Sequence, residues 1–71
     1  MVENNDKQIV LSKKESQILS LIVSGRTSTQ IAETVNLSLP TIKWYRKKLK
    51  ERFDAETTAE MVGKAIKAGF Y

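Results

Sequence analysis

Apolar residues recur every three to four positions along most of this chain, the spacing of one helix face. Four segments show this pattern, over roughly 13–24, 28–35, 39–53 and 58–68. No run alternates apolar and polar residues and no Asn-Gly pair marks a hairpin, so strands are not expected. The pattern predicts an all-α, four-helix (tetrahelical) domain over residues 11–71, preceded by a flexible tail or linker remnant over residues 1–10.

Local capping residues mark where these helices begin and end. Three hydroxyl residues have an acid or amide three positions later, the spacing of a capping box: Ser12 with Glu15, Thr27 with Gln30 and Thr57 with Glu60. Ser38 is a fourth N-cap, followed by Pro40 in the first turn, where proline is tolerated. Residues suited to a left-handed conformation follow three of the helices: Gly25, Asn36 and Gly69.

The apolar positions define an expected core. In the first three helices it comprises Ile18, Leu19, Leu21, Ile22, Val23, Ile31, Ala32, Val35, Ile42, Leu49 and Phe53, with Tyr45 at its margin. In the fourth helix the expected inward residues are Ala59, Val62 and Ile66. The opposite side of that helix would then carry Met61, Lys64 and Ala68. An outward methionine between small residues fits either a weak protein interface or an ordinary exposed position.

Only three residues, 36–38, join the second and third helices, and so short a connection forces them into a tight helix-turn-helix pair. Ala32 is small enough for the third helix to cross closely, and Ile42 lies inside the angle. At about 100° per residue, Leu49 and Phe53 fall within about 20° of Ile42 and form a buried line.

The side of the third helix opposite this line carries Lys43, Trp44, Lys47 and Lys48. A large aromatic residue set away from the core indicates contact with a partner, which beside lysines is best explained as nucleic acid. Alternatively, Trp44 folds back onto the tail or packs on another protein. Arg46 and Lys50 flank the buried line, where their stems can lie along core residues. Arg52 can pair with Glu56 or Glu60, or can have no specific role.

Charge is concentrated in the same segment. The chain has a net charge of +4, and residues 43–52 hold six basic residues and one acidic residue. Outside this window six basic residues face seven acidic ones, so the basicity is local. A focused basic patch favours a polyanionic partner, although a solvated charged face gives the same pattern.

Composition excludes several kinds of chemistry. The chain lacks cysteine and histidine, which removes Ser-His-Asp and Cys-His catalysis, zinc fingers and thiolate metal sites. With no glycine-rich phosphate loop either, neither an enzyme nor a cofactor or metal is expected. The longest nearly apolar run, residues 18–23, is too short to span a bilayer, and the polar N-terminus is unlike a signal peptide. We therefore expect no membrane partner and a cytoplasmic location.

The chain resembles the LuxR/GerE-type helix-turn-helix domain over about fifty of its 71 residues. The matching segments read LSKKESQILSLIVSGRT, QIAETVNLSLPTIK, KKLKERFDA and TTAEMV. Domains of this family form the C-terminal, DNA-binding end of many bacterial transcription regulators, often response regulators of two-component systems. The resemblance implies a sequence-specific DNA-binding module whose recognition helix, about 39–53, enters the major groove.

The resemblance also implies roles for individual residues. Lys43, Trp44 and Lys47 occupy positions that reach base edges, and Thr27 and Thr41 occupy positions that meet phosphates, although helix capping alone also explains these threonines. The remaining recognition-helix candidates are Tyr45 at the core edge, Arg46 and Lys48. Trp44 is bulkier than the aliphatic residue often found there, and Pro40 removes one backbone donor.

The family implies a weak homodimer on DNA through the fourth helix, with Met61, Lys64 and Ala68 as the candidate contacts. RNA polymerase is a further candidate partner. The alternative function is a protein-interaction module that docks its basic helix on an acidic protein surface.

Overall fold

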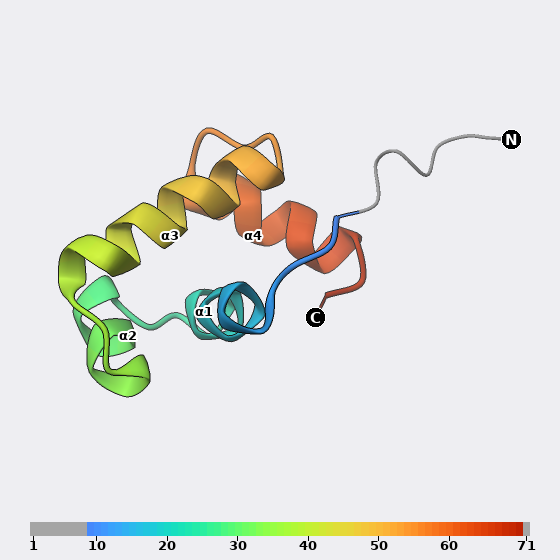
Figure 1. The fold of residues 1–71 in the computed structure, drawn as a ribbon. Helices are drawn as coiled ribbons and strands as arrows, with labels where there is room; N and C mark the ends of the chain where they lie inside the picture. Colours follow the sequence, from blue (N-terminus) through green and yellow to red (C-terminus); the bar gives the residue numbers. More distant parts are fainter. Residues whose placement is uncertain (1–8, 71) are drawn as a thin grey trace, which may run out of the picture.

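The computed structural model describes residues 9–70, which form four α-helices and, within that range, no strand. They are α1 (Lys13–Val23), α2 (Ser28–Val35), α3 (Leu39–Arg52) and α4 (Thr58–Lys67) (Figure 1). The predicted all-α class and the limits of all four helices are confirmed to within one residue at each end. None of these helices is long and apolar enough to cross a membrane.

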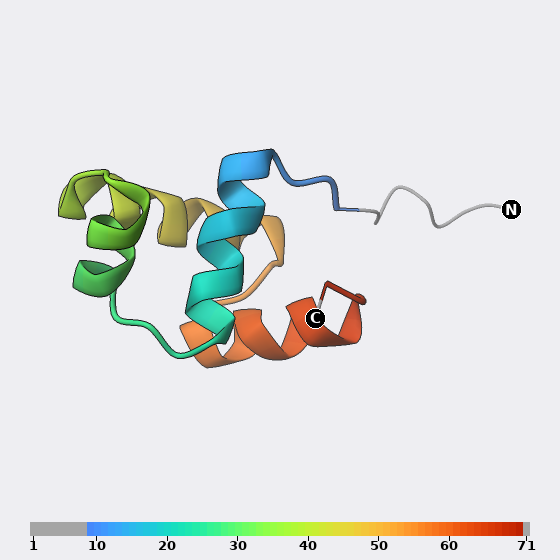
Figure 2. The ribbon, with the colours of Figure 1, turned by 90° about the horizontal axis from the view of Figure 1, so that it is seen from below.

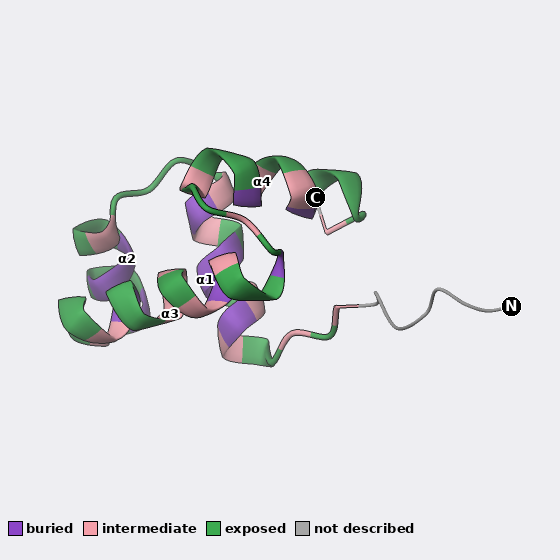
Figure 3. Cartoon of the chain, turned by 90° about the horizontal axis from the view of Figure 1, so that it is seen from above, coloured by how far each residue is buried: buried purple, intermediate pink, exposed green. Residues whose placement is uncertain are grey.

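The longest helix, α3, is the helix against which the other three pack. It contacts α1, α2 and α4. The turn between α2 and α3 lies at one end of the molecule and α4 at the other, with α1 between them (Figures 1 and 2). Buried residues line the helix surfaces that face one another, and exposed residues cover the outside (Figure 3). The arrangement is a single core with α3 along one side of it.

The core contains most of the expected residues. Its buried members are Ile18, Leu19, Ile22, Ile31, Ala32, Val35, Ile42, Leu49, Phe53, Met61 and Ala65. Ile9 also packs against this core. The packed structure therefore includes a residue that was assigned to the tail, and the rest of that tail, residues 1–8, lies outside the described range.

Capping hydrogen bonds hold the helix starts as predicted, with one difference. Complete capping boxes are present at Ser12 and Thr27. At α4, Thr57 accepts from the Glu60 backbone N–H at 3.1 Å, but the Glu60 carboxylate accepts from the Glu56 N–H at 2.9 Å rather than from Thr57. The Glu60 carboxylate thus bonds to the residue before the N-cap, whereas in a capping box it bonds to the N-cap itself.

Left-handed residues end three helices where the sequence placed them. Gly25, Asn36 and Gly69 have φ of 92°, 60° and 90°. Asp54, directly after the C-cap of α3, also has a positive φ of 53°, which the sequence did not indicate. Aspartate tolerates this conformation better than most residues because its short side chain bonds locally.

The expected orientation of α4 is wrong. Met61 and Ala65, one turn apart, are fully buried, whereas Ala59 is exposed and Ile66 is 50% exposed. Met61 is therefore a core residue and not part of an outer contact surface. A long, flexible methionine fills the space beside α3 better than alanine can. The Phe70 ring meets the Phe53 ring edge-on, at 5.6 Å between centroids, and so links the segment after α4 to the end of α3.

A partly buried ion pair, between the buried Glu15 and the exposed Arg52, joins the start of α1 to the end of α3. The Glu15 carboxylate accepts from the Ser12 backbone N–H at 2.9 Å and from the Arg52 guanidinium at 3.1 Å. The same guanidinium donates to the Val10 carbonyl at 3.0 Å. The partner of Arg52 is therefore Glu15, and not Glu56 or Glu60, the two candidates that the sequence offered. The Ser12 N–H, followed by the Arg52 charge, lowers the Glu15 pKa despite the opposing effect of burial.

We expect Met61→Ala to destabilise the domain by about 2–5 kcal/mol, because it leaves a cavity in the core. Ile66→Ala, the matched control on the exposed side of α4, should cost less than about 1 kcal/mol. Urea unfolding followed by circular dichroism measures both. A larger loss for Ile66→Ala than for Met61→Ala would mean that α4 is rotated from the orientation described.

Glu15 should make the domain sensitive to acid. Since folding lowers the pKa of this carboxyl, its contribution is fully present above the unfolded pKa of about 4.3. That contribution is lost as pH falls through the lower pKa of the folded state. Glu15→Gln should lower the free energy of unfolding at neutral pH and flatten its fall below about pH 4.3. Parallel pH profiles for the two proteins would contradict a stabilising role for the charged carboxylate.

Candidate nucleic-acid interface

The rotation of α3 about its axis is fixed by its buried side. Ile42, Leu49 and Phe53 face the core, as the helical spacing predicted. Lys43, Trp44 and Lys47 are exposed, and Lys48 is half-buried. The prediction that Trp44 lies opposite the core is confirmed by its exposed fraction of 54%. One exposed face of α3 thus carries three lysines around a single indole.

The turn between α2 and α3 sets the angle at which this face is presented. Asn36 adopts the left-handed conformation, and the Leu37 N–H donates back to the Ala32 carbonyl at 3.0 Å. Ser38 then caps α3, accepting from the Thr41 N–H at 3.3 Å. The chain reverses within three residues, so α2 lies against the N-terminal half of α3 (Figure 1). This is the helix-turn-helix arrangement that the connector length predicted.

The indole of Trp44 is held by its neighbours. The Lys48 ammonium nitrogen lies 5.1 Å from the centre of the indole, within cation–π range. The Tyr45 ring meets the indole edge-on, at 5.1 Å between centroids and 79° between planes. Tyr45 is half-buried and packs against the core. A hollow of about 210 Å³ beside the indole is lined by Trp44, Lys47, Lys48 and Glu51.

The other predicted contact residues lie in different surroundings. The Arg46 guanidinium donates to the Thr58 hydroxyl at 3.0 Å, so it faces α4 rather than the exposed lysines. Thr27 is exposed at the start of α2, and its hydroxyl accepts from the Gln30 N–H at 3.1 Å. The Thr41 and Ser38 hydroxyls share a hydrogen bond of 2.8 Å. The structure brings Lys43, Trp44, Lys47 and Lys48 onto one face and leaves Arg46 outside it.

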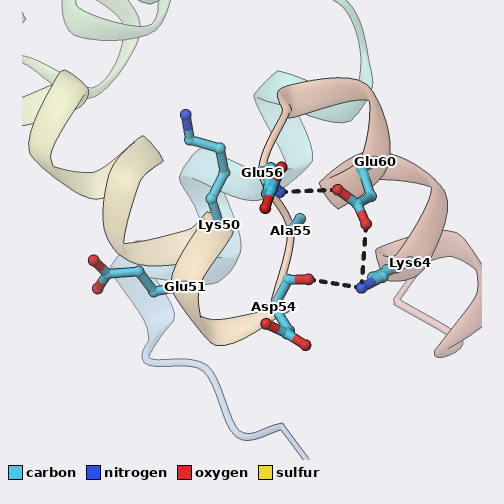
Figure 4. A pocket seen from close by; sticks show the side chains of 7 residues that line it. All are labelled: Lys50, Glu51, Asp54, Ala55, Glu56, Glu60 and Lys64. Atoms are coloured by element: carbon cyan, nitrogen blue, oxygen red, sulfur yellow. Dashed lines mark hydrogen bonds and ion pairs between the residues drawn. The ribbon is translucent and has the colours of Figure 1, made fainter.

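A second hollow, of about 520 Å³, lies between the end of α3 and the start of α4 (Figure 4). It is lined by Lys50, Glu51, Asp54, Ala55, Glu56, Glu60 and Lys64. The Lys64 ammonium donates to the Asp54 carbonyl at 2.7 Å and pairs with the Glu60 carboxylate at 3.5 Å. The Glu56 N–H, then the Lys64 charge, lowers the pKa of Glu60. Four carboxylates against two ammonium groups make this region a poor surface for a polyanion.

The sequence reasoning missed this second cluster. Lys64 was expected on the outer side of α4, but its ammonium bonds to the Asp54 carbonyl in the loop between α3 and α4 and pairs with Glu60. Within residues 9–70, no group of three or more acidic, cysteine or histidine side chains is placed to hold a metal ion. The signal that could have located Lys64 is its spacing of four residues from Glu60, which favours an ion pair along the helix.

A short turn, a supporting helix and a second helix with a basic exposed face define a helix-turn-helix DNA-binding domain. Comparison with known proteins indicates the same class of domain. The family model for bacterial regulatory proteins of the luxR family matches residues 9–65. The chain belongs to this family, and it is a DNA-binding module of the transcription-regulator type.

Its relatives are longer bacterial regulators. The chain is 39% identical over 59 residues to the transcriptional regulatory protein MctR of Rhizobium johnstonii. It is 33% identical over 66 residues to the oxygen regulatory protein NreC of Staphylococcus haemolyticus. These matches cover 83% and 93% of this chain but only 28% and 30% of the relatives. The chain therefore corresponds to less than a third of the length of either protein.

Solved structures give the same fold. The Vibrio cholerae VqmA dimer without target DNA matches 99% of this chain with a TM-score of 0.87 at 27% identity, over 32% of its own length. The VqmA–ligand–DNA complex matches 89% with a TM-score of 0.85 at 28% identity, over 28% of its length. The first belongs to the LuxR-type receptors, and the second contains VqmA together with ligand and DNA.

Proposed function

We propose that this chain binds double-stranded DNA sequence-specifically, with α3 in the major groove and α2 across the backbone. The observation that carries the proposal is the exposed face of α3, where Lys43, Trp44 and Lys47 point away from a core that fixes their direction. An α-helix fits the major groove, in which each base pair presents a distinct pattern of donors and acceptors. VqmA, which includes a segment of this fold, has been solved in complex with DNA, and this supports DNA as the partner.

The contacts divide into two groups in this proposal. Lys43 and Lys47 donate to base edges, for which guanine O6 and N7 are the preferred acceptors. Thr27 and Thr41 contact phosphates, and Lys48 lies over the Trp44 ring. A threonine hydroxyl that accepts a capping bond can still donate its own proton, so capping and phosphate contact are compatible at Thr27. Arg46 supports α4 through Thr58 instead of contacting DNA.

We further propose a weak homodimer on DNA through the side of α4 that the structure exposes. Ala59, Gly63 and Ile66 are exposed and follow the spacing of one helix face, with the half-buried Val62 at its edge, and a Cβ at Gly63 would meet open space. This surface replaces the predicted contacts Met61, Lys64 and Ala68. Met61 is buried, and Lys64 bonds to the loop between α3 and α4. Ala68 remains exposed at the end of the helix. One short helix face offers less than the roughly 1,000 Å² of a stable interface, so pairing depends on DNA.

In the whole regulator, this module would select the promoter while other domains sense the signal. The segment that is similar to this chain makes up 30% of NreC and 40% of the response regulatory protein YgeK of Escherichia coli. Such a module acts in the cytoplasm, where DNA and RNA polymerase are both available, and contact with polymerase would follow promoter binding.

Lys43→Ala and Lys47→Ala should each weaken binding to a preferred duplex, selected from a random pool by the wild-type domain. Each should lose about 1–3 kcal/mol of discrimination against random sequence. Lys67→Ala is the matched control, because it removes an equal charge from the far end of α4 (Figure 1). Gel shift measures all three.

Unchanged affinity and preference in both variants would place the DNA contacts elsewhere. If the wild-type domain bound polyglutamate as tightly as any duplex, the alternative of an acidic protein partner would replace DNA.

Ile66→Glu should weaken binding to a duplex with two half-sites by about tenfold, equivalent to about 1.4 kcal/mol of lost pairing. Binding to one half-site should not change, because Ile66 lies on α4 and away from the exposed face of α3. Gln17→Glu, which adds the same charge on an exposed position of α1, is the control. Equal weakening on one and two half-sites would show that Ile66 does not mediate pairing.

A further inference from the structure

Trp44 provides a large apolar surface in an otherwise cationic region. Its indole is 54% exposed, among lysines on the face of α3 opposite the core. A large aromatic side chain left in water offers its apolar surface to a partner. The chemistry of its partner follows from which part of the ring is free.

The ring is positioned before any partner arrives. Lys48 places its ammonium 5.1 Å from the ring centre, over one face. Tyr45, packed against the core, meets the ring edge-on at 79°. Stacking on an unpaired base requires an open ring face, which Lys48 restricts. The hollow beside the ring, bounded by Lys47, Lys48 and Glu51, leaves room for a group approaching from the side.

In the major groove, the apolar group that projects from the bases is the C5 methyl of thymine. Cytosine presents only hydrogen at that carbon, unless it is methylated. The other base edges present hydrogen-bond donors and acceptors, which the indole ring surface does not satisfy.

We propose that Trp44, positioned by Lys48, reads the 5-methyl group of one pyrimidine in the recognised duplex. This inference rests on the proposed function and adds a specificity to it: thymine or 5-methylcytosine is preferred over uracil or cytosine at the position facing Trp44. Lys48 is a positioning residue, since it acts through the ring.

The test uses the duplex selected by the wild-type domain, with each thymine replaced in turn by deoxyuridine. At one position per half-site, uracil should weaken wild-type binding about fourfold, from about 0.8 kcal/mol for a buried methyl-sized group. Trp44→Ala should bind thymine and uracil duplexes equally. Lys43→Ala should bind both more weakly but keep the fourfold ratio. Placing 5-methylcytosine, paired with guanine, at that position should bind more tightly than cytosine.

The ratio of the affinities for the thymine and uracil duplexes also tests the role of Lys48. Lys48→Ala should reduce the preference for thymine, and Lys48→Arg should restore it, because a guanidinium also stacks over an indole. A general loss of positive charge would lower both affinities and leave the ratio unchanged.

The outcomes are distinct. A domain that bound no duplex would overturn the proposed function and this inference together. Tight, sequence-specific binding with no uracil effect at any position would overturn only the methyl contact. A uracil effect that persisted in Trp44→Ala would assign it to another residue or to DNA shape. Circular dichroism confirms that each variant is folded.

Discussion

The burial of one side of α3 determines what the rest of the molecule can do. Ile42, Leu49 and Phe53 lie along that side and are almost inaccessible to water. Turning the helix would expose all three, and burying each such side chain contributes about 1.5–3 kcal/mol. The directions of Lys43 and Trp44 are therefore consequences of the core, and no hydrogen bond of their own is needed to hold the helix in this orientation.

Helix limits and the exposed face of α3 could be predicted because their determinants are local or repeated. Each N-cap bonds to a backbone N–H three residues later, and the structure confirms this at Ser12, Thr27, Ser38 and Thr57. On α3 the buried line extends over three turns, so one misleading position could not change its direction. The turn between α2 and α3 was likewise encoded in three consecutive residues.

The orientation of α4 could not be predicted in the same way. This helix has only ten residues and two neighbouring apolar lines, one through Met61 and Ala65 and one through Val62 and Ile66. The sequence pattern hardly separates them, and the choice depends on the shape that α1 and α3 leave open. The Arg52–Glu15 pair was equally inaccessible, because its partners are 37 residues apart and meet only in the folded chain. The exposed face of α3 was predicted correctly except for Arg46, which bonds to Thr58, whereas the predicted orientation of α4 was wrong.

The two arginines of α3 bond to groups within the protein, and this affects the electrostatics of the proposed DNA binding. Arg46 bonds to Thr58, and Arg52 bonds to Glu15 and Val10, so two of the six cationic residues in 43–52 have partners within the protein. Each phosphate that a free cation neutralises releases about 0.9 of a condensed counterion, and this release drives sequence-independent attraction. Because two of its cations already have partners within the protein, α3 gains less from counterion release on DNA than its formal charge implies. In the proposed DNA complex, a larger share of the affinity would then come from contacts that distinguish one base pair from another.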